Sequence, residues 1–224
     1  QGTRIVPVPE SLSDELVAPA NCALATIANV LSHVPVSASS VLVQGAGLLG
    51  IYACAWLRER GVETRFICRE HPGNLIAVLR RYAIPVTLLP APPQSAADAR
   101  VEDYAVWLGV SQAEDADQTV AALRGTQWDW LIVDHYGLDI EWEEQVRPHV
   151  TSLLVIDDLP GRRHECDLLL NQNFSLGRLD RHEGLLPKTA RVLLGPRYAL
   201  LNRAYLAYRR TLQRRDGEVR RVLV

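Results

Sequence analysis

Short apolar runs alternate along the chain with segments whose apolar residues recur every three to four positions. Short apolar runs between turn residues are typical of buried strands, and a period near 3.6 residues is typical of helices. Strands are predicted at residues 41–44, 64–68, 86–89, 130–133, 152–156, 168–170 and 191–194, and helices at 14–31, 49–60, 74–82, 101–108, 113–123 and 198–214. This alternation predicts an α/β fold, a doubly wound parallel sheet of Rossmann-like type.

Polar side chains gather where the predicted strands end. The segment WLIVDHYG passes from an apolar strand into Asp134, His135 and Tyr136 just before a glycine. Ligands of open α/β sheets bind outside the carboxyl ends of the strands, so these three residues are the catalytic candidates. The structural alternative is that Asp134 caps the next helix, His135 packs in a loop and Tyr136 fills a gap.

The next two predicted strands end in the same manner. Asp157 and Asp158 follow one of them, and Asn171, Gln172 and Asn173 follow the other. The loop between them carries Arg162, Arg163 and His164. We expect these three to pair with the aspartates, and the alternative is that they hold an anionic ligand.

Four ordered segments resemble a known family. They are FICREHPGNLI, DWLIVDHYGLD, VIDDLPGRRHECDLLLNQN and LLGPRYALL, within about residues 57–224. They look like the amino-terminal domain of UDP-2,4-diacetamido-2,4,6-trideoxy-β-L-altropyranose hydrolase, the GT-B-fold UDP-sugar hydrolase of the pseudaminic acid pathway. The resemblance implies that water attacks the anomeric carbon of a UDP-sugar and that UDP leaves.

The same resemblance implies a substrate site on this half of the enzyme. The expected substrate-binding residues are His71, Asn173, Arg197 and Tyr198. The alternative for His71, which precedes Pro72, is an ordinary loop residue. The alternative for the Gly-Pro pair before Arg197 is an ordinary turn at the end of a strand. We expect no metal and no cofactor in this interpretation.

The glycine-rich turn after the first strand departs from that family. The family carries G-x-G-H-x-x-R there, and the resemblance makes its histidine the general base, whereas this chain has Leu48 at that place. Gly45, Gly47 and Gly50 instead match the dinucleotide fingerprint G-x-G-x-x-G, in which backbone amides approach a pyrophosphate at a helix amino terminus. The alternative cofactor is therefore NAD or NADP.

The residues before the glycine turn also favour a dinucleotide-binding dehydrogenase. Residues 12–31 resemble the helix before the cofactor domain of medium-chain zinc alcohol dehydrogenases, with Cys22 matching one zinc ligand. An acidic residue for the ribose is expected at the end of the second strand, where Glu70 alone can serve, while Arg69 suits a phosphate. The alternative functions are thus an NAD(P)-binding fragment of a dehydrogenase and an inactive hybrid.

The domain organisation follows from these segments. Residues 1–40 are expected to form a helical, dehydrogenase-like lead-in, 41–197 the Rossmann-like domain, 198–218 a connecting helix and 219–224 the first strand of a further domain. The 224 residues contain no methionine, so Gln1 is not an unprocessed start. We expect the amino-terminal half of a larger enzyme, inactive without its nucleotide-binding carboxy-terminal domain.

Composition and charge indicate which classes of partner and which cellular compartment to expect. The net charge of −2 provides no field for nucleic acid. Cys54 and Cys68 lie in apolar contexts typical of buried free thiols, and there is no C-x-x-C pair. No apolar run reaches the ~18 residues of a membrane span, and no leader opens the chain. We therefore expect a cytoplasmic protein that binds neither nucleic acid nor membrane.

Overall fold

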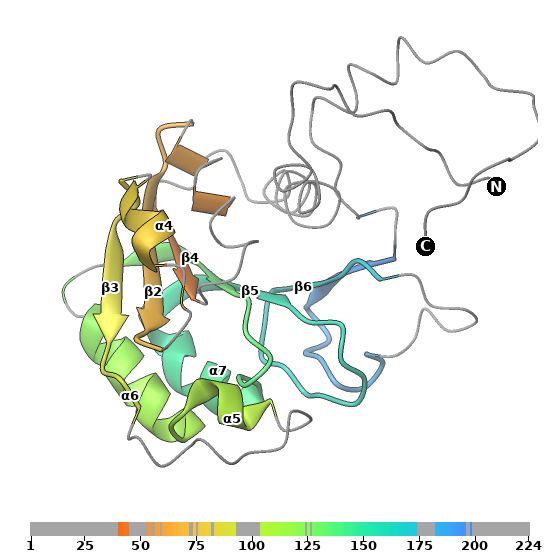
Figure 1. Ribbon diagram of the computed structural model, residues 1–224. Coiled ribbons are helices and arrows are strands. Elements are labelled where there is room, and N and C mark those ends of the chain that lie inside the picture. The colour runs from red at the N-terminus through yellow and green to blue at the C-terminus, as the bar shows by residue number, and fades with distance from the viewer. Residues whose placement is uncertain are drawn as a thin grey trace, which may run out of the picture.

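The computed structural model describes residues 40–44, 53–54, 57–58, 60–71, 74, 76–81, 83–92, 104–123, 125, 127–173, 182–195 and 198 (Figure 1). Within them the chain forms seven strands in one sheet. The strands are β1 (Ser40–Gln44), β2 (Glu63–Arg69), β3 (Val86–Leu89), β4 (Trp128–Val133), β5 (Val150–Ile156), β6 (Leu168–Asn171) and β7 (Arg191–Leu194). Each of the seven predicted strands is present.

The sheet is parallel throughout, and its strand order is β3-β2-β1-β4-β5-β6-β7. The chain therefore winds outward from β1 in one direction and from β4 in the other, which confirms the predicted doubly wound, Rossmann-like α/β fold. The point where the winding reverses lies between β1 and β4. Ligands of such folds bind beside this point, outside the carboxyl ends of the strands.

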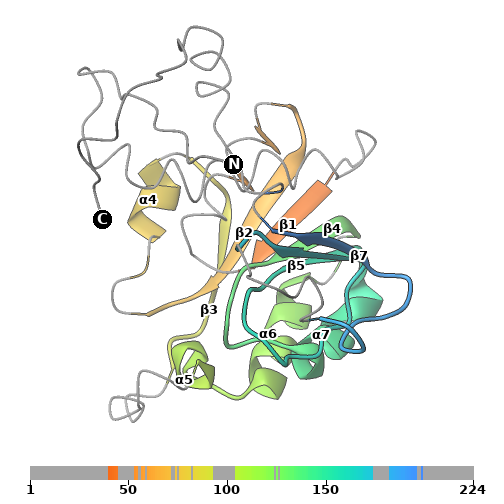
Figure 2. The same ribbon diagram turned by 90° about the vertical axis from the view of Figure 1, so that its right-hand side faces the viewer.

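Helices cover both faces of the sheet. They are α4 (Ile76–Arg81), α5 (Ala105–Leu108), α6 (Gln112–Leu123), α7 (Ile140–Val146) and the 3-10 turn η3 (Arg147–His149). In Figure 2, α4 lies on one side of the sheet and α6 and α7 lie on the other. No helix within the described ranges has the length and apolar character needed to cross a bilayer.

Each face has its own hydrophobic core. Val41 and Val43 of β1 pack in the cluster that contains Leu79 of α4, whereas Leu42 packs in the cluster that contains Trp142 of α7. Successive side chains of a strand point to opposite faces, so a strand covered on both sides is apolar at nearly every position. This explains why uninterrupted apolar runs identified the strands correctly.

The structure corrects several predicted boundaries. The strands β4 and β5 begin two residues earlier than expected, because Trp128 is buried and pairs with Val150. Helix α4 begins at Ile76, whose backbone N–H donates to Oδ1 of Asn74 at 3.2 Å. Cys54, Cys68 and Cys166 are free and buried, as predicted for the first two.

Other predicted features lie outside the described residues. They are the lead-in before residue 40, the glycine turn at 45–50 and the connecting helix and final strand beyond Tyr198.

Candidate functional site

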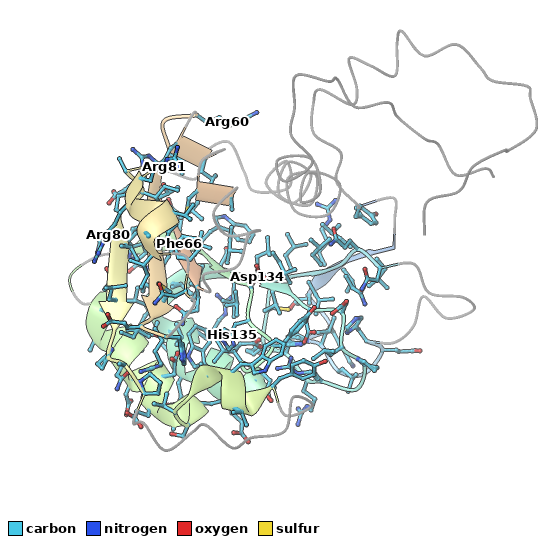
Figure 3. All side chains as sticks on the ribbon, viewed as in Figure 1. Arg60, Phe66, Arg80, Arg81, Asp134 and His135 are labelled. Atoms are coloured by element: carbon cyan, nitrogen blue, oxygen red, sulfur yellow. The ribbon has the colours of Figure 1, made fainter. Side chains whose placement is uncertain are left out.

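The candidate catalytic residues Asp134, His135 and Tyr136 follow β4 directly, beside the point where the winding reverses. The backbone N–H of Asp134 donates to the carbonyl of Gln44 at 3.0 Å, which continues the ladder between β4 and β1 by one residue. The triplet therefore lies at the carboxyl edge of the sheet, as predicted. Figure 3 labels Asp134 and His135 near the middle of the molecule, away from the arginines at its periphery.

Asp134 is a partly exposed carboxyl with an unusual charge environment. Burial, and secondly the negative charge of Asp158, raise its pKa from 3.8 to about 7. Such a carboxyl takes up and releases a proton near neutral pH, which is what general acid–base chemistry requires. The structural alternative for Asp134 is wrong, because Asp139 caps α7 and accepts from the backbone N–H of Glu141 at 3.0 Å.

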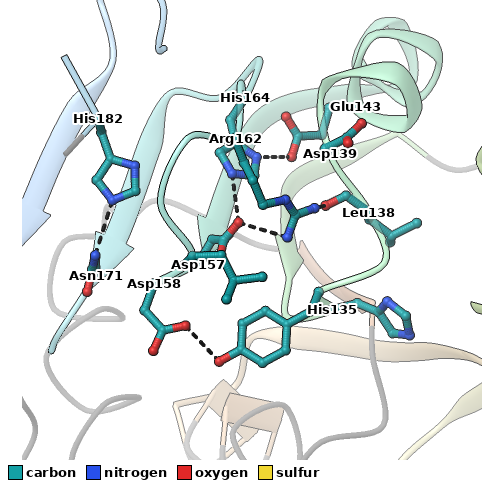
Figure 4. A network of polar contacts seen from close by, with 12 residues as sticks. His135, Leu138, Asp139, Glu143, Asp157, Asp158, Arg162, His164, Asn171 and His182 are labelled. Carbon is teal, nitrogen blue, oxygen red and sulfur yellow. Dashed lines mark hydrogen bonds and ion pairs between the residues drawn. The ribbon is translucent and has the colours of Figure 1, made fainter. Parts of the chain in front are cut away.

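Asp158 connects three strand ends, and Figure 4 shows its contact with the tyrosine hydroxyl. It follows β5, and its Oδ1 accepts a hydrogen bond of 2.8 Å from the hydroxyl of Tyr136, which follows β4. Its Oδ2 accepts a second hydrogen bond from the side-chain amide of Asn173, which follows β6. Burial and this contact raise the pKa of Tyr136, so its hydroxyl stays protonated and donates. The sequence predicted polar residues at these three ends, and the structure brings them together.

His135 points away from Asp158 in Figure 4. Its Nδ1 accepts a hydrogen bond of 3.0 Å from the backbone N–H of Gly137, which leaves the proton on Nε2. The ring is partly exposed, and burial lowers its pKa from 6.5 to about 4, so it is neutral at physiological pH. A Cβ at Gly137 would lie 2.9 Å from Cε1 of this ring, so the turn accepts only glycine without rearrangement.

His71, predicted to bind substrate, lies close enough to His135 for its charge to act on that ring. Burial, before any other influence, lowers the pKa of His71, and charge on His71 would lower the pKa of His135. Among the described residues no hydrogen-bond partner meets the buried Nε2 of His71. Both imidazoles are therefore neutral at physiological pH.

A buried polar cluster fixes the loop that carries Asp158. Nδ1 of His164 lies 2.7 Å from Oε1 of Glu143, and Nε2 of the same ring lies 2.9 Å from Oδ2 of Asp157. Arg162 forms an ion pair with the same Asp157 oxygen at 3.0 Å. Although burial alone would lower the pKa of His164, its two carboxylate partners raise it to about 9. The predicted pairing of this loop with the aspartates is confirmed for Arg162 and His164.

A second buried ion pair joins Arg69 to Asp115 of α6. Arg69 Nη2 lies 2.5 Å from Asp115 Oδ2, and Trp142 Nε1 donates to the other oxygen at 2.9 Å. The side chains of Arg69 and Asp115 are 3% and 0% exposed, so the guanidinium of Arg69 is held in this pair. The sequence signal for Asp115 is an acidic residue on the buried stripe of α6, which was not among the predicted site residues.

The remaining predicted residues divide into two groups. Tyr198 is partly buried against the core cluster that contains Leu79, and its backbone N–H donates to the carbonyl of Gly195 at 3.0 Å. Arg197 and the glycines Gly45, Gly47 and Gly50 lie outside the described residues. Within the part of the chain that the structure describes, no group of three histidine, cysteine or acidic side chains is arranged to hold a metal ion.

Comparisons with known proteins give one partial sequence match. No family model matches the chain. The UDP-2,4-diacetamido-2,4,6-trideoxy-β-L-altropyranose hydrolase of Campylobacter jejuni is 27% identical over 93 residues, which are 42% of this chain and 34% of that protein. The match thus spans about a third of the relative's length.

Solved structures resemble the chain at lower sequence identity. An alcohol dehydrogenase from Thermotoga maritima aligns with a TM-score of 0.47 and 16% identity, covering 89% of this chain and 47% of that one. A mitochondrial 2-enoyl thioester reductase from Candida tropicalis aligns with a TM-score of 0.38 and 11% identity, covering 65% and 37%. By its own sheet order the chain is a Rossmann-like α/β protein, and by sequence it has partial similarity to a UDP-sugar hydrolase.

Proposed function

We propose that this chain is the amino-terminal, sugar-binding half of a cytoplasmic nucleotide-sugar hydrolase of the UDP-2,4-diacetamido-2,4,6-trideoxy-β-L-altropyranose hydrolase type, acting in pseudaminic acid biosynthesis. The observation that carries the proposal is Asp134, a carboxyl with a pKa of about 7 at the carboxyl edge of the sheet. The partial match to the Campylobacter jejuni hydrolase supports the substrate class. A carboxy-terminal domain in the GT-B arrangement would hold the nucleotide.

In this mechanism Asp134 is the general base. The family that the chain resembles is expected to use a histidine of the glycine turn, where this chain has Leu48. Ionised Asp134 takes a proton from water while the water oxygen bonds to the anomeric carbon. The bond from that carbon to the phosphate oxygen breaks, and its electron pair leaves with UDP. A base whose pKa lies near the working pH suits this step.

The neighbouring residues orient the substrate. Tyr136 and Asn173 both donate to Asp158, so they form a fixed polar wall beside Asp134. His135 directs its Nε2–H away from the turn and is the proposed donor to a sugar hydroxyl or acetamido oxygen. We also propose His71, Arg197 and Tyr198 as substrate-binding residues. No metal and no cofactor take part in this scheme.

UDP release tests the proposal. The isolated chain should release UDP from the UDP-sugar at least about 10²-fold more slowly than a fusion with the relative's carboxy-terminal domain, because nucleotide binding energy is missing. His135→Ala should lower turnover by the fusion without changing its melting temperature. Turnover by the isolated chain at the rate of the intact relative would contradict the proposal, as would a fusion that releases no UDP.

A second function is favoured by one observation. Strand β1 is central, borders the point where the winding reverses, and leads directly into the G-x-G-x-x-G sequence at residues 45–50. This is the place of the pyrophosphate turn in dinucleotide-binding folds. The alternative is therefore an NAD- or NADP-binding fragment of a zinc-dependent medium-chain dehydrogenase.

Calorimetry with NAD and NADP tests this alternative. If the turn has the geometry of a pyrophosphate site, the chain should bind one of them weakly, and Gly47→Val should abolish binding because its side chain occupies the place of the pyrophosphate. Ala77→Val serves as the control, because it adds a β-branched side chain at an exposed position of ordinary helical backbone in α4. Absence of heat at millimolar dinucleotide removes the dehydrogenase alternative.

A further inference from the structure

Three aromatic rings pack together beside the candidate site. The ring centroids of Tyr104 and Trp107 are 5.0 Å apart with an edge-on angle of 86°, and those of Tyr104 and Tyr136 are 5.2 Å apart. The centroids of Trp107 and Tyr136 are 6.2 Å apart. All three distances lie within the range of favourable aromatic pairs. We call these residues the aromatic cluster.

Trp107 is the part of the cluster that faces solvent. Its side chain is 47% exposed, and among the described residues no other large hydrophobic side chain is exposed. Trp128 and Trp142, by contrast, are fully buried. The indole packs against two other rings, which hold it in place outside the hydrophobic core. One of its aromatic surfaces therefore stays accessible to solvent.

Close backbone packing holds the cluster against the catalytic candidates. Gly109 ends α5 in the left-handed region with φ of 76°, and a Cβ there would lie 2.6 Å from Pro92 and 2.9 Å from His71. A Cβ at Gly137 would lie 2.9 Å from the carbonyl oxygen of Tyr104. Gly137 therefore lets the turn after β4 approach the start of α5 closely, and Gly109 lets the end of α5 approach the segments that follow β2 and β3. As a result, Trp107 has a defined position relative to the triplet.

Tyr136 belongs to both groups. Its ring packs against Tyr104, and its hydroxyl donates to Asp158, whose charge contributes to the raised pKa of Asp134. An aromatic surface and several hydrogen-bonding groups therefore adjoin one another. A pyranose has matching properties, because its C–H faces are apolar and its rim carries hydroxyl or acylamino groups.

We propose that the aromatic cluster is a stacking platform for the pyranose ring of the substrate, with Trp107 as its exposed surface. The inference rests on the proposed function, because it places the anomeric carbon at Asp134. The pyranose contains that carbon, whereas the uracil is separated from it by a diphosphate and a ribose. The sugar is therefore the ring that reaches the platform.

Binding measurements on the full chain test this inference without requiring turnover. The probes are the free sugar 2,4-diacetamido-2,4,6-trideoxy-altropyranose and, separately, UDP, each titrated by ligand-observed NMR. Trp107→Leu and Trp107→Ala should weaken sugar binding about three- to tenfold, the range expected for loss of one aromatic contact. Trp107→Phe is the matched variant that keeps a ring, and it should retain most of the affinity. Thermal unfolding verifies that each variant is folded.

The outcomes separate this inference from the proposed hydrolase activity. Sugar binding that weakens in the Leu and Ala variants upholds the platform even if no protein tested releases UDP. Equal sugar affinity in all four proteins, or no sugar binding by the unaltered chain, overturns it. Weakened UDP binding with unchanged sugar binding also overturns the platform proposal, because the aromatic cluster would then contact the uracil of the nucleotide. If the fusion with a carboxy-terminal domain hydrolyses UDP-sugar with KM unchanged by Trp107→Leu, the platform falls while the activity stands.

Discussion

Replacing Asp134 by asparagine is expected to stabilise the folded chain at pH 8 while removing the proposed catalytic base. At that pH the folded protein keeps a carboxylate that burial and Asp158 disfavour, and the neutral amide relieves both costs. A pKa raised from 3.8 to about 7 corresponds to about 4 kcal/mol. Because the side chain keeps some contact with water, we expect roughly half of this, about 2 kcal/mol.

The pH dependence of the unfolding free energy tests separately whether ionised Asp134 destabilises the fold. Asp134 has a higher pKa in the folded state, so its contribution to stability is fully present below pH 3.8 and is lost as the pH rises through about 7. Asp134→Asn should therefore flatten the fall in unfolding free energy between these values. Urea unfolding at several pH values measures this change in the pH dependence. The substitution Asp117→Asn, at an exposed position, is the matched control.

The same variant should lower kcat of the two-domain fusion by about 10²- to 10⁴-fold, the usual loss for a general base. Greater stability with lost turnover is the combination expected of a carboxyl kept for chemistry rather than for folding. A variant that is less stable at pH 8 than the unaltered chain would contradict the charge environment described for Asp134. Unchanged turnover would show that another group is the base.

The strands could be predicted from the sequence because the fold covers both faces of the sheet. Each central strand is apolar at successive positions, and that pattern is visible without knowledge of the neighbours. The first residues of β4 were missed because Asp129 interrupts the apolar run. In the structure, its Oδ2 accepts from the backbone N–H of Ser40 at 3.0 Å, so this polar residue belongs to the start of the strand pair.

The candidate site could be predicted only as a set of strand ends. That Asp158 joins Tyr136 and Asn173 follows from the spatial order of β4, β5 and β6, which the sequence does not state directly. The buried partners Arg69 and Asp115 are 46 residues apart, and nothing in their local patterns links them. The aromatic cluster was also missed, because Trp107 in a short amphipathic segment is indistinguishable from a core residue.

The buried His164 cluster gives the second large expected effect. The imidazole has 0% exposed side-chain surface, and both ring nitrogens lie at hydrogen-bond distance from carboxylates, so it must be protonated to donate to both. Glu143 also accepts from the backbone N–H of Glu165 at 2.6 Å. His164→Ala should destabilise the fold by about 3–5 kcal/mol, because two buried carboxylates lose their shared cationic partner. The exposed His149→Ala is the matched control and should change stability by less than about 0.5 kcal/mol.

Rising pH should weaken the same cluster in the unaltered protein. The pKa of His164 is higher in the folded state, at about 9 against 6.5, so its stabilisation is complete below pH 6.5 and is lost as the pH rises through about 9. The loss amounts to about 3 kcal/mol over this window, which lies largely above that of Asp134. Unfolding free energies measured from pH 6 to pH 10 should fall in the unaltered chain and in Asp134→Asn, but far less in His164→Ala. If all three proteins fall in parallel, His164 is neutral in the folded state and the doubly bonded imidazolium is wrong. If the fall above pH 7 is missing only from His164→Ala, the loop that presents Asp158 to Tyr136 is held by a charge that alkaline pH removes.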